Sequence, residues 1–456
     1  MKNIITRKSI IILLFAFFGI SFFWFILDYK RVEAPAPEIE LQTLNADADT
    51  DTDTDTETKS ETVEILPPSV TDYRDLPTRE AVMTNVSEDL DAPWAFTWLP
   101  SGDLLVTERF GALNIIPADG SDSKSISGLP EVFSGGQGGL LDVSLHPNFT
   151  ENQFLYLSYA HGNQEGNRLR VARAKLENTT LENLEVIFEV AQTKAGSSHF
   201  GSRFQWLPDN TLLFSVGDGG NPPNQYNGEL IREQAQKLNA HLGKVIRIND
   251  DGSIPVDNPF VSRPDVLPEI WSYGHRNIQG LTYDSLRGQV IASEHGSKGG
   301  DELNRVVAGK NYGWPEATFS TEYDLPGTPI SDTQTLPSTE DPVAVWTPTI
   351  APSSVQFYNG NQYEDNVDGS LFLAAMLLRS NTSIGAYMSS PAGAILRLIT
   401  DEAGNVTAQE RINVGDFRVR SVAQGPDGFL YVLTDSTGRQ SRPGTNGGAL
   451  WRMESF

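Results

Sequence analysis

The stretch that decides the fold is Ala95-Phe-Thr-Trp-Leu-Pro-Ser-Gly-Asp-Leu-Leu-Val106, in which a tight Pro-Ser-Gly-Asp turn joins two short apolar runs. Runs of this length, bounded by turn residues, predict a pair of β-strands. The pattern returns as Phe204-Gln-Trp-Leu-Pro-Asp-Asn-Thr-Leu-Leu-Phe214 and again as Val422-Ala-Gln-Gly-Pro-Asp-Gly-Phe-Leu-Tyr-Val-Leu433. The chain therefore repeats one β-unit over more than 300 residues.

Three further units complete the repeat. They are Leu141-Asp-Val-Ser-Leu-His-Pro-Asn148 with Phe154-Leu-Tyr-Leu157, Leu281-Thr-Tyr-Asp284 with Gln289-Val-Ile-Ala292, and Val355-Gln-Phe-Tyr358 with Leu371-Phe-Leu-Ala374. Six such units predict an all-β, six-bladed β-propeller over residues 76–456. A β-sandwich or two all-β domains is the alternative, but no linker-like break divides the repeat. Residues 229–242 have helical spacing and predict one helix in a long loop.

Composition narrows the function. The 456 residues include 40 Gly and 27 Pro, which suits short strands and turns, and the net charge of −25 argues against a nucleic-acid partner. The absence of cysteine excludes disulfides, thiolate catalysis and iron–sulfur clusters. The six histidines show no metal-binding spacing, and the chain has neither a Gly-x-Ser-x-Gly elbow nor a Gly-x-Gly-x-x-Gly loop after a strand. Zinc hydrolases, serine esterases and nicotinamide enzymes are therefore disfavoured.

The N-terminus predicts a membrane anchor. Residues 9–27 carry no charge and are long enough to span a bilayer, and positive residues precede them, so we expect residues 1–32 to be a signal anchor. Residues 33–75 are rich in Pro, Asp and Thr and predict a disordered acidic linker. The propeller would then lie outside the cytoplasm, in the periplasm or the extracellular space. The alternative is a long signal peptide cut near Ala34, which would release a secreted protein.

Five polar clusters beside glycines adjoin the repeated strands. Loops at strand ends usually carry the ligands of a propeller. Arg418 and Arg420 alternate on one strand, which suits either an acidic cofactor or an ordinary solvated face. The clusters are Gly135-Gly-Gln-Gly-Gly139, Ser197-Ser-His-Phe-Gly-Ser-Arg203, Gly274-His-Arg-Asn-Ile-Gln-Gly280, Glu294-His-Gly-Ser-Lys-Gly-Gly-Asp-Glu302 and Asp416-Phe-Arg-Val-Arg420.

These clusters resemble the soluble glucose/sorbosone dehydrogenase family from about Asp91 to Arg452. The resemblance also rests on the strings Gly243-Lys-Val-Ile-Arg-Ile-Asn-Asp-Asp-Gly-Ser-Ile-Pro-Val-Asp-Asn-Pro-Phe260, Gly309-Lys-Asn-Tyr-Gly-Trp-Pro315 and Ala351-Pro-Ser-Ser354. That family uses pyrroloquinoline quinone (PQQ). The resemblance implies oxidation of an aldose at its anomeric carbon to a lactone, with electrons passed to a respiratory quinone or cytochrome.

The resemblance also implies roles for single residues. His199 corresponds to the general base that takes the proton of the anomeric hydroxyl, and Gln137 to a glutamine that contacts sugar and quinone. Arg276 and Asn277 match a pair that lies over the cofactor, where the guanidinium can stabilise negative charge. The residues that match the family's contacts to the cofactor carboxylates are Arg418, Arg420 and Thr349.

Calcium is implied in the same way. The family places one Ca²⁺ against the quinone through backbone carbonyls that correspond to Gly296 and Ser297, and hard oxygen ligands suit this ion. Asp301, Glu302 and the Tyr312 carbonyl match a further, structural calcium site. Without the resemblance, Asp301 and Glu302 would be interpreted as an ordinary solvated acidic pair.

Two departures from the family separate the competing hypotheses. Ser198 stands where the family's best-known members have an aspartate before the catalytic histidine, and Ala374–Ser383 lacks their cofactor-binding lysine, for which Arg379 is the candidate substitute. An inactive propeller that binds a sugar or a protein is therefore one alternative. A calcium-dependent propeller lactonase is another. The sequence names neither the sugar nor the oligomeric state.

Overall fold

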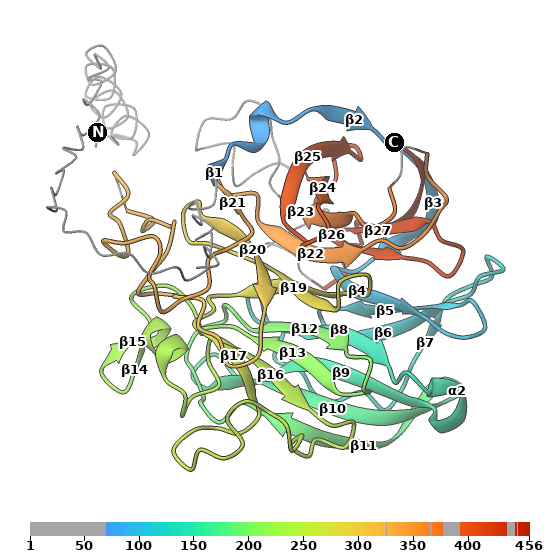
Figure 1. Ribbon diagram of the computed structural model, residues 1–456. Coiled ribbons are helices and arrows are strands. Elements are labelled where there is room, and N and C mark those ends of the chain that lie inside the picture. The colour runs from blue at the N-terminus through green and yellow to red at the C-terminus, as the bar shows by residue number, and fades with distance from the viewer. Residues whose placement is uncertain (1–69, 325, 365–366, 377–392, 436–442, 445) are drawn as a thin grey trace, which may run out of the picture. The chain divides into compact units, whose positions relative to one another are not determined.

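The computed structural model describes residues 70–324, 326–364, 367–376, 393–435, 443–444 and 446–456. Six sheets of four or five strands stand around a ring, and each has one edge strand on the inside of the ring (Figure 1). These inner strands contact one another in chain order and the last contacts the first, so the predicted six-bladed propeller is confirmed. They are β4 (Pro93–Trp98), β8 (Leu140–Leu145), β12 (Gly201–Trp206), β18 (Ile278–Asp284), β22 (Pro352–Phe357) and β26 (Val419–Gln424).

Each predicted unit is the hairpin formed by the inner strand and the second strand of a blade. Both strands of a hairpin are almost continuously buried, because a blade packs against a neighbour on each face. This explains why the repeats consist of uninterrupted apolar runs. The second strands are β5 (Leu104–Glu108), β9 (Phe154–Gly162), β13 (Leu212–Val216), β19 (Gln289–Glu294), β23 (Leu371–Ala375) and β27 (Leu430–Thr434).

The outer strands complete the blades in antiparallel order. The last blade has only three strands from the C-terminal part of the chain, and β3 (Val82–Leu90) pairs with β28 (Gly448–Ser455) to supply the fourth. This pairing joins the two ends of the propeller and closes the ring. The other outer strands are β6 (Ala112–Ile116), β7 (Lys124–Ser125), β10 (Asn167–Glu177), β11 (Thr180–Glu189), β16 (Lys244–Ile248), β17 (Ile270–Tyr273), β20 (Asp301–Val306), β21 (Ala344–Trp346), β24 (Ala394–Thr400) and β25 (Val406–Asn413).

Residues ahead of β3 also belong to the propeller. Strand β1 (Val70–Thr71) adds in parallel to β21, and β2 (Thr78–Glu80) adds in parallel to β25. The structured part thus begins before the predicted boundary at residue 76. The predicted anchor and most of the predicted linker lie outside the described residues and stay predictions. No helix among the described residues has the length and apolar character needed to span a membrane.

The core consists of six apolar clusters, and each lies between two neighbouring blades. One cluster, for example, packs Tyr156 of the second blade against Phe204 and Phe214 of the third. Another packs Leu433 and Leu450 of the last blade against Phe96 of the first. Burial of apolar surface therefore stabilises the ring as a whole rather than single blades.

The prediction of a helix over residues 229–242 is wrong. Glu229–Leu230 form strand β15, which pairs with β14 (Gln225–Tyr226), and Ile231–Gln236 form a short 3-10 helix. The buried ammonium of Lys244 explains the difference, because it donates to the carbonyls of Gln234, Ala235 and Leu242 at 2.9, 2.9 and 2.7 Å. Those carbonyls point at Lys244 and are not available to the amides that a longer α-helix would present.

Candidate active site

The residues predicted from sequence gather at one edge of the ring. In every blade the inner strand starts at this edge and the antiparallel second strand ends at it. Residues just before an inner strand, or just after a second strand, therefore meet around the central channel. The predicted residues at this edge are Gln137 before β8, His199 before β12, Arg276 and Asn277 before β18, Thr349 before β22, Arg418 before β26 and Arg420 within it.

His199 is buried and paired with a carboxylate. Its Nδ1 lies 2.6 Å from Oδ1 of Asp218, which follows β13 and is fully buried. The second oxygen of Asp218 accepts a hydrogen bond from the Trp314 indole at 2.9 Å, and its first also accepts the Gly220 amide at 3.0 Å. A carboxylate held in this way fixes the proton on Nδ1 and leaves Nε2 as the basic nitrogen.

Asp218 was missed in the sequence. The available signal was the run Val216-Gly-Asp-Gly-Gly220 at the end of a repeated strand, which resembles an ordinary turn. The structure shows that Asp218 supplies the carboxylate beside His199, although Ser198 replaces the aspartate expected before it. The departure at Ser198 therefore does not leave the imidazole without an acidic partner.

Burial lowers the pKa of His199 below its usual value, and the nearby charges of Arg276 and Lys194 lower it further, against the opposing effect of Asp218. Burial alone would raise the pKa of Asp218, but its interaction with His199, the charge of Arg276 and the hydrogen bond from the Gly220 amide hold it below its usual value. Burial lowers the pKa of Lys194 to about 7, and its ammonium donates to Asn167 Oδ1 at 3.0 Å. His199 is thus neutral, and able to act as a base, at neutral pH.

Arg276 and Asn277 adjoin this pair. The Arg276 guanidinium donates to Asn221 Oδ1 at 2.7 Å and to the His295 carbonyl at 3.0 Å. Its Nε is buried and has no hydrogen-bond partner within the described ranges. The Asn277 side-chain oxygen accepts the Gly201 amide at 3.1 Å, so Asn277 also supports the turn that carries His199.

Gln137 and Thr349 make contacts within the protein. The side-chain oxygen of Gln137 accepts the backbone amide of His199 at 2.7 Å, which brings the Gly-rich loop of the second blade next to the histidine. The Thr349 hydroxyl donates to Asp301 at 2.5 Å. Gln137 thus lies beside His199, and the hydroxyl of Thr349 is bound to a carboxylate. The contacts to sugar and cofactor expected of these two residues stay predictions.

Arg418 and Arg420 share one acidic partner. They lie 3.1 and 3.5 Å from the same oxygen of the buried Asp435. A further arginine that was not predicted, Arg109, donates to the Gly136 carbonyl at 2.5 Å. Burial lowers the pKa of Arg109, and the charge of Arg420 lowers it further, against the opposing effects of Asp435 and Asp91.

The arginines at this edge fit an anionic cofactor such as PQQ. Arg109, Arg276, Arg418 and Arg420 lie at one edge of the ring, and Asp435 is paired with Arg418 and Arg420. The Nε of Arg420, like that of Arg276, is buried without a hydrogen-bond partner among the described residues. Such donors suit bidentate binding of carboxylates. Arg379, the candidate substitute for the missing lysine, lies outside the described residues.

A small cavity beside Arg276 fits a cation. Its volume of about 10 Å³ matches one water or ion. Burial and the neighbouring Glu294 raise the pKa of Glu302 to about 8, so two carboxyl groups lie close together here, and Glu294 also lies 3.1 Å from His275 Nδ1. Among the described residues no group of three His, Asp or Glu could hold a metal, so carbonyl ligands would be needed. The lining includes Glu294, Gly296, Glu302, Tyr312 and Thr318.

Two of the five predicted metal residues make other bonds. The Asp301 carboxylate accepts hydrogen bonds from the Gly296, Ile350 and Ala351 amides at 2.8, 2.7 and 2.8 Å, besides that from Thr349. It holds the loop rather than facing the cavity. The Ser297 carbonyl accepts the Tyr323 hydroxyl at 2.7 Å. Gly296, Glu302 and Tyr312 line the cavity.

Comparisons with known proteins agree with this geometry. The sequence profile of the glucose/sorbosone dehydrogenase family matches residues 90–442. The chain is 32% identical to the aldose sugar dehydrogenase of Escherichia coli over 77% of its length and 89% of that protein. It is similar to a crystal structure of a glucose dehydrogenase, with 34% identity and a TM-score of 0.71 over 82% of this chain and 99% of that one. The PQQ-bound aldose sugar dehydrogenase of Streptomyces coelicolor is 25% identical, with a TM-score of 0.62 over 83% of this chain and 99% of that one.

Proposed function

Because the chain belongs to the glucose/sorbosone dehydrogenase family, we propose that it oxidises aldose sugars at the anomeric carbon to the lactone with PQQ as cofactor. The observation that carries the proposal is the buried His199–Asp218 pair, which lies at the same edge of the ring as four arginines. A neutral base close to fixed positive charge suits removal of a proton from the anomeric hydroxyl together with a hydride from the carbon that bears it.

His199 acts as the general base of this reaction. Its Nε2 takes the proton of the anomeric hydroxyl while Nδ1 donates to Asp218, which remains anionic and stabilises the imidazolium that forms. When bound, PQQ supplies the chemistry of a hydride acceptor. Arg276 provides a fixed positive charge where negative charge develops, and its bonds to Asn221 and His295 hold the guanidinium in place.

The remaining residues would hold the cofactor and its metal. Arg418 and Arg420 would bind carboxylates of PQQ, and Gln137 would contact both the sugar and the quinone. Calcium would bind at Gly296 and in the cavity between Glu294 and Glu302, where two facing carboxylates support the assignment of a divalent cation. The bound ion would polarise the quinone as a Lewis acid.

We also propose where in the cell the reaction takes place. The charge-free run of residues 9–27 supports an anchored protein whose propeller lies outside the cytoplasm, close to a respiratory quinone or cytochrome that accepts the electrons. An anchor and a tether of this kind would keep the propeller near a membrane-bound acceptor.

Product analysis on a panel of aldoses tests the proposal. The full chain is supplied with Ca²⁺, PQQ and an artificial electron acceptor, and the sugar acids and lactones are identified by mass spectrometry. We expect an aldonolactone that depends on PQQ. Hydrolysis of an added lactone without PQQ would indicate a lactonase instead. Binding of sugars without turnover would indicate an inactive propeller.

A further inference from the structure

The turn that carries His199 has an unusual backbone. His199 and Ser202 adopt positive φ angles of 52° and 88°, and Gly201 between them has a φ of 67°. The register of the hairpin shifts between Gly201 and Phe204, as expected for a β-bulge. Non-glycine residues in this region each cost about 1–3 kcal/mol unless their surroundings hold them. Something must therefore hold residues 199–204 in this form.

Side chains from the strands and loops around this turn form hydrogen bonds with the backbone of five of its six residues. The contacts come from the second, third and fourth blades, so the conformation of the turn depends on how three blades are placed. The contacts are His199 N to Gln137 at 2.7 Å, Gly201 N to Asn277 at 3.1 Å, Gly201 O from Gln279 at 3.3 Å, Ser202 O from Ser158 at 3.0 Å, Arg203 N to Ser215 at 3.2 Å and Phe204 N to Asp142 at 2.7 Å.

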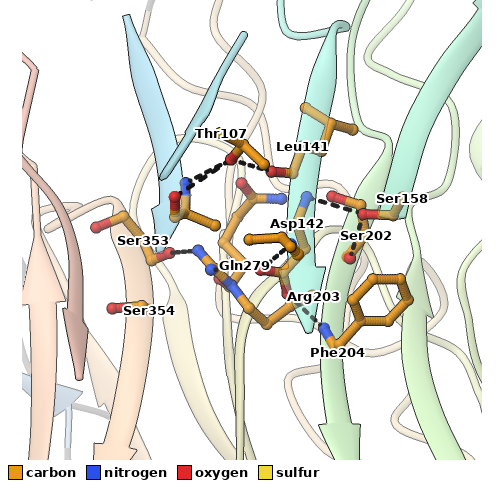
Figure 2. A network of polar contacts seen from close by, with 12 residues as sticks. Thr107, Leu141, Asp142, Ser158, Ser202, Arg203, Phe204, Gln279, Ser353 and Ser354 are labelled. Atoms are coloured by element: carbon orange, nitrogen blue, oxygen red, sulfur yellow. Dashed lines mark hydrogen bonds and ion pairs between the residues drawn. The ribbon is translucent and has the colours of Figure 1, made fainter. Parts of the chain in front are cut away.

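One of these side chains, Asp142, is also paired with a residue of the turn itself. Figure 2 shows Asp142 and Arg203 facing each other between the inner strands. The Asp142 oxygens accept the Phe204 amide, the Val143 amide at 3.0 Å and the Arg203 guanidinium at 3.4 Å. Both side chains are buried. Asp142 therefore fixes the end of the turn through its backbone and through its side chain.

Arg203 extends this connection across the channel. Its Nε donates to the Gln279 carbonyl of the fourth blade at 3.0 Å, and its Nη2 donates to the Ser353 carbonyl of the fifth blade at 2.9 Å (Figure 2). Its guanidinium also lies 4.2 Å from the ring of Trp94 in the first blade. A residue four positions after His199 thus contacts four other blades.

We propose that Asp142 and Arg203 are positioning residues that hold the strained turn and thereby aim His199 at the substrate. This inference rests on the proposed function, since it concerns how the base is placed. Arg203 ties the turn to distant blades, and Asp142 neutralises Arg203 while it accepts the Phe204 amide. Loss of either connection lets the bulge relax, and the imidazole moves away from Asp218 and out of its buried position.

The variant Asp142→Asn tests this role. An amide keeps the size of the side chain but turns its NH2 donor either toward the Phe204 amide or toward the Val143 amide and Arg203. The matched control is Asp284→Asn, because the buried Asp284 pairs with Arg287 at 2.6 Å and lies at the opposite end of its inner strand. Both variants are made in the full chain. The assays are steady-state aldose oxidation, PQQ binding, and NMR titration of the ¹⁵N-labelled histidines, with the His199 signal assigned through His199→Gln.

Asp142→Asn should lower kcat about 100-fold with little change in KM or in PQQ binding. The pKa of His199 should rise toward its ordinary value as the ring leaves its buried position, while Asp284→Asn changes neither quantity. Equal kcat and equal His199 titration in the two variants would overturn the proposal. If the wild type oxidises no aldose, the proposed function fails, yet the NMR titration still decides whether Asp142 positions His199.

A second variant covers the case in which Asp142→Asn does not fold. Arg203→Lys keeps the positive charge beside Asp142 but cannot reach Gln279 and Ser353 together. It should also lower kcat and shift the His199 titration. Wild-type values of both in Arg203→Lys would show that the links across the channel do not position the base.

Discussion

At the scale of single residues, Asp218 determines how His199 functions. Its carboxylate accepts a hydrogen bond from His199 Nδ1 at 2.6 Å. Burial lowers the pKa of His199, and Asp218 offsets part of this decrease. The net pKa lies below the ordinary value, so the base stays neutral through mildly acidic pH. We therefore expect kcat of the wild type to decline only below about pH 6.5.

The variant Asp218→Asn tests this account of the pair. Removal of the carboxylate takes away an influence that raises the pKa of His199, so the acid limb of the pH profile should move to still lower pH. The imidazole also loses its fixed tautomer, and kcat should fall about 100-fold or more. A pH–rate profile measures both effects. An acid limb that moves to higher pH, or an unchanged kcat, would contradict the pairing.

Glu302 provides a test of the proposed cation. Its pKa is raised to about 8 in the folded protein from 4.5, so the folded state binds more protons than the unfolded state between these values. Without metal, the contribution of Glu302 to stability is full below pH 4.5 and is lost as pH rises toward 8. Ca²⁺ at neutral pH should restore it and raise the melting temperature.

Thermal unfolding in EDTA and in Ca²⁺, from pH 5 to pH 8, measures this effect. The variant Glu302→Gln carries no titratable group at this position, so its melting temperature should depend less on pH between 4.5 and 8 and should rise less with Ca²⁺ than that of the wild type. If Ca²⁺ stabilises Glu302→Gln as much as the wild type, the ion binds elsewhere.

At the scale of elements, the hairpins were predictable and the connections were not. All six strand pairs could be predicted because each blade buries both faces of its first two strands, which requires apolar runs bounded by turns. Residues 229–242 have helical spacing, but the spacing reports only which side chains are buried. It does not reveal that Lys244, which lies outside the segment, donates hydrogen bonds to the carbonyls of residues 234, 235 and 242.

Replacement of Lys244 measures what this contact contributes. In Lys244→Met, the three carbonyls of residues 234, 235 and 242 lose their donor in a buried place, which should lower the free energy of unfolding by about 3 kcal/mol. Lys237→Met is the control, since Lys237 lies in the same segment but forms a partly exposed ion pair with Glu229 and should change stability by less than about 1 kcal/mol. Chemical denaturation compares the two variants. A similar loss in both would show that the Lys244 contacts do not hold the segment.

The candidate site was predictable only in part, because some of its residues lie in turns of ordinary sequence or pair with residues of another blade. Gln137, His199, Arg276, Arg418 and Arg420 lie at strand starts, where the repeat itself indicates loops of the active edge. Asp218 and Arg109 lie just after second strands, where the sequence resembles a plain turn. Pairings between blades, such as Asp142 with Arg203, join residues 61 positions apart and leave no local pattern.

At the scale of the whole molecule, closure of the ring places these residues in one site. The pairing of β3 with β28 completes the last blade and fixes Arg418 and Arg420 opposite the loops of the other blades. The chain carries a net charge of −25, yet Arg109, Arg276, Arg418 and Arg420 collect at one edge of the ring. Under the proposed function, their local charge would attract an anionic cofactor to this edge although the net charge of the whole molecule is negative.

The most direct test of the central claim is the rate of glucose-dependent dye reduction by the PQQ-loaded full chain, compared between the wild type and His199→Ala at equal PQQ occupancy. The account predicts that the wild type turns over only with PQQ, and that His199→Ala binds PQQ but loses about 10²–10⁴-fold in rate. Wild-type turnover by His199→Ala, or dye reduction by the wild type without PQQ, would contradict it.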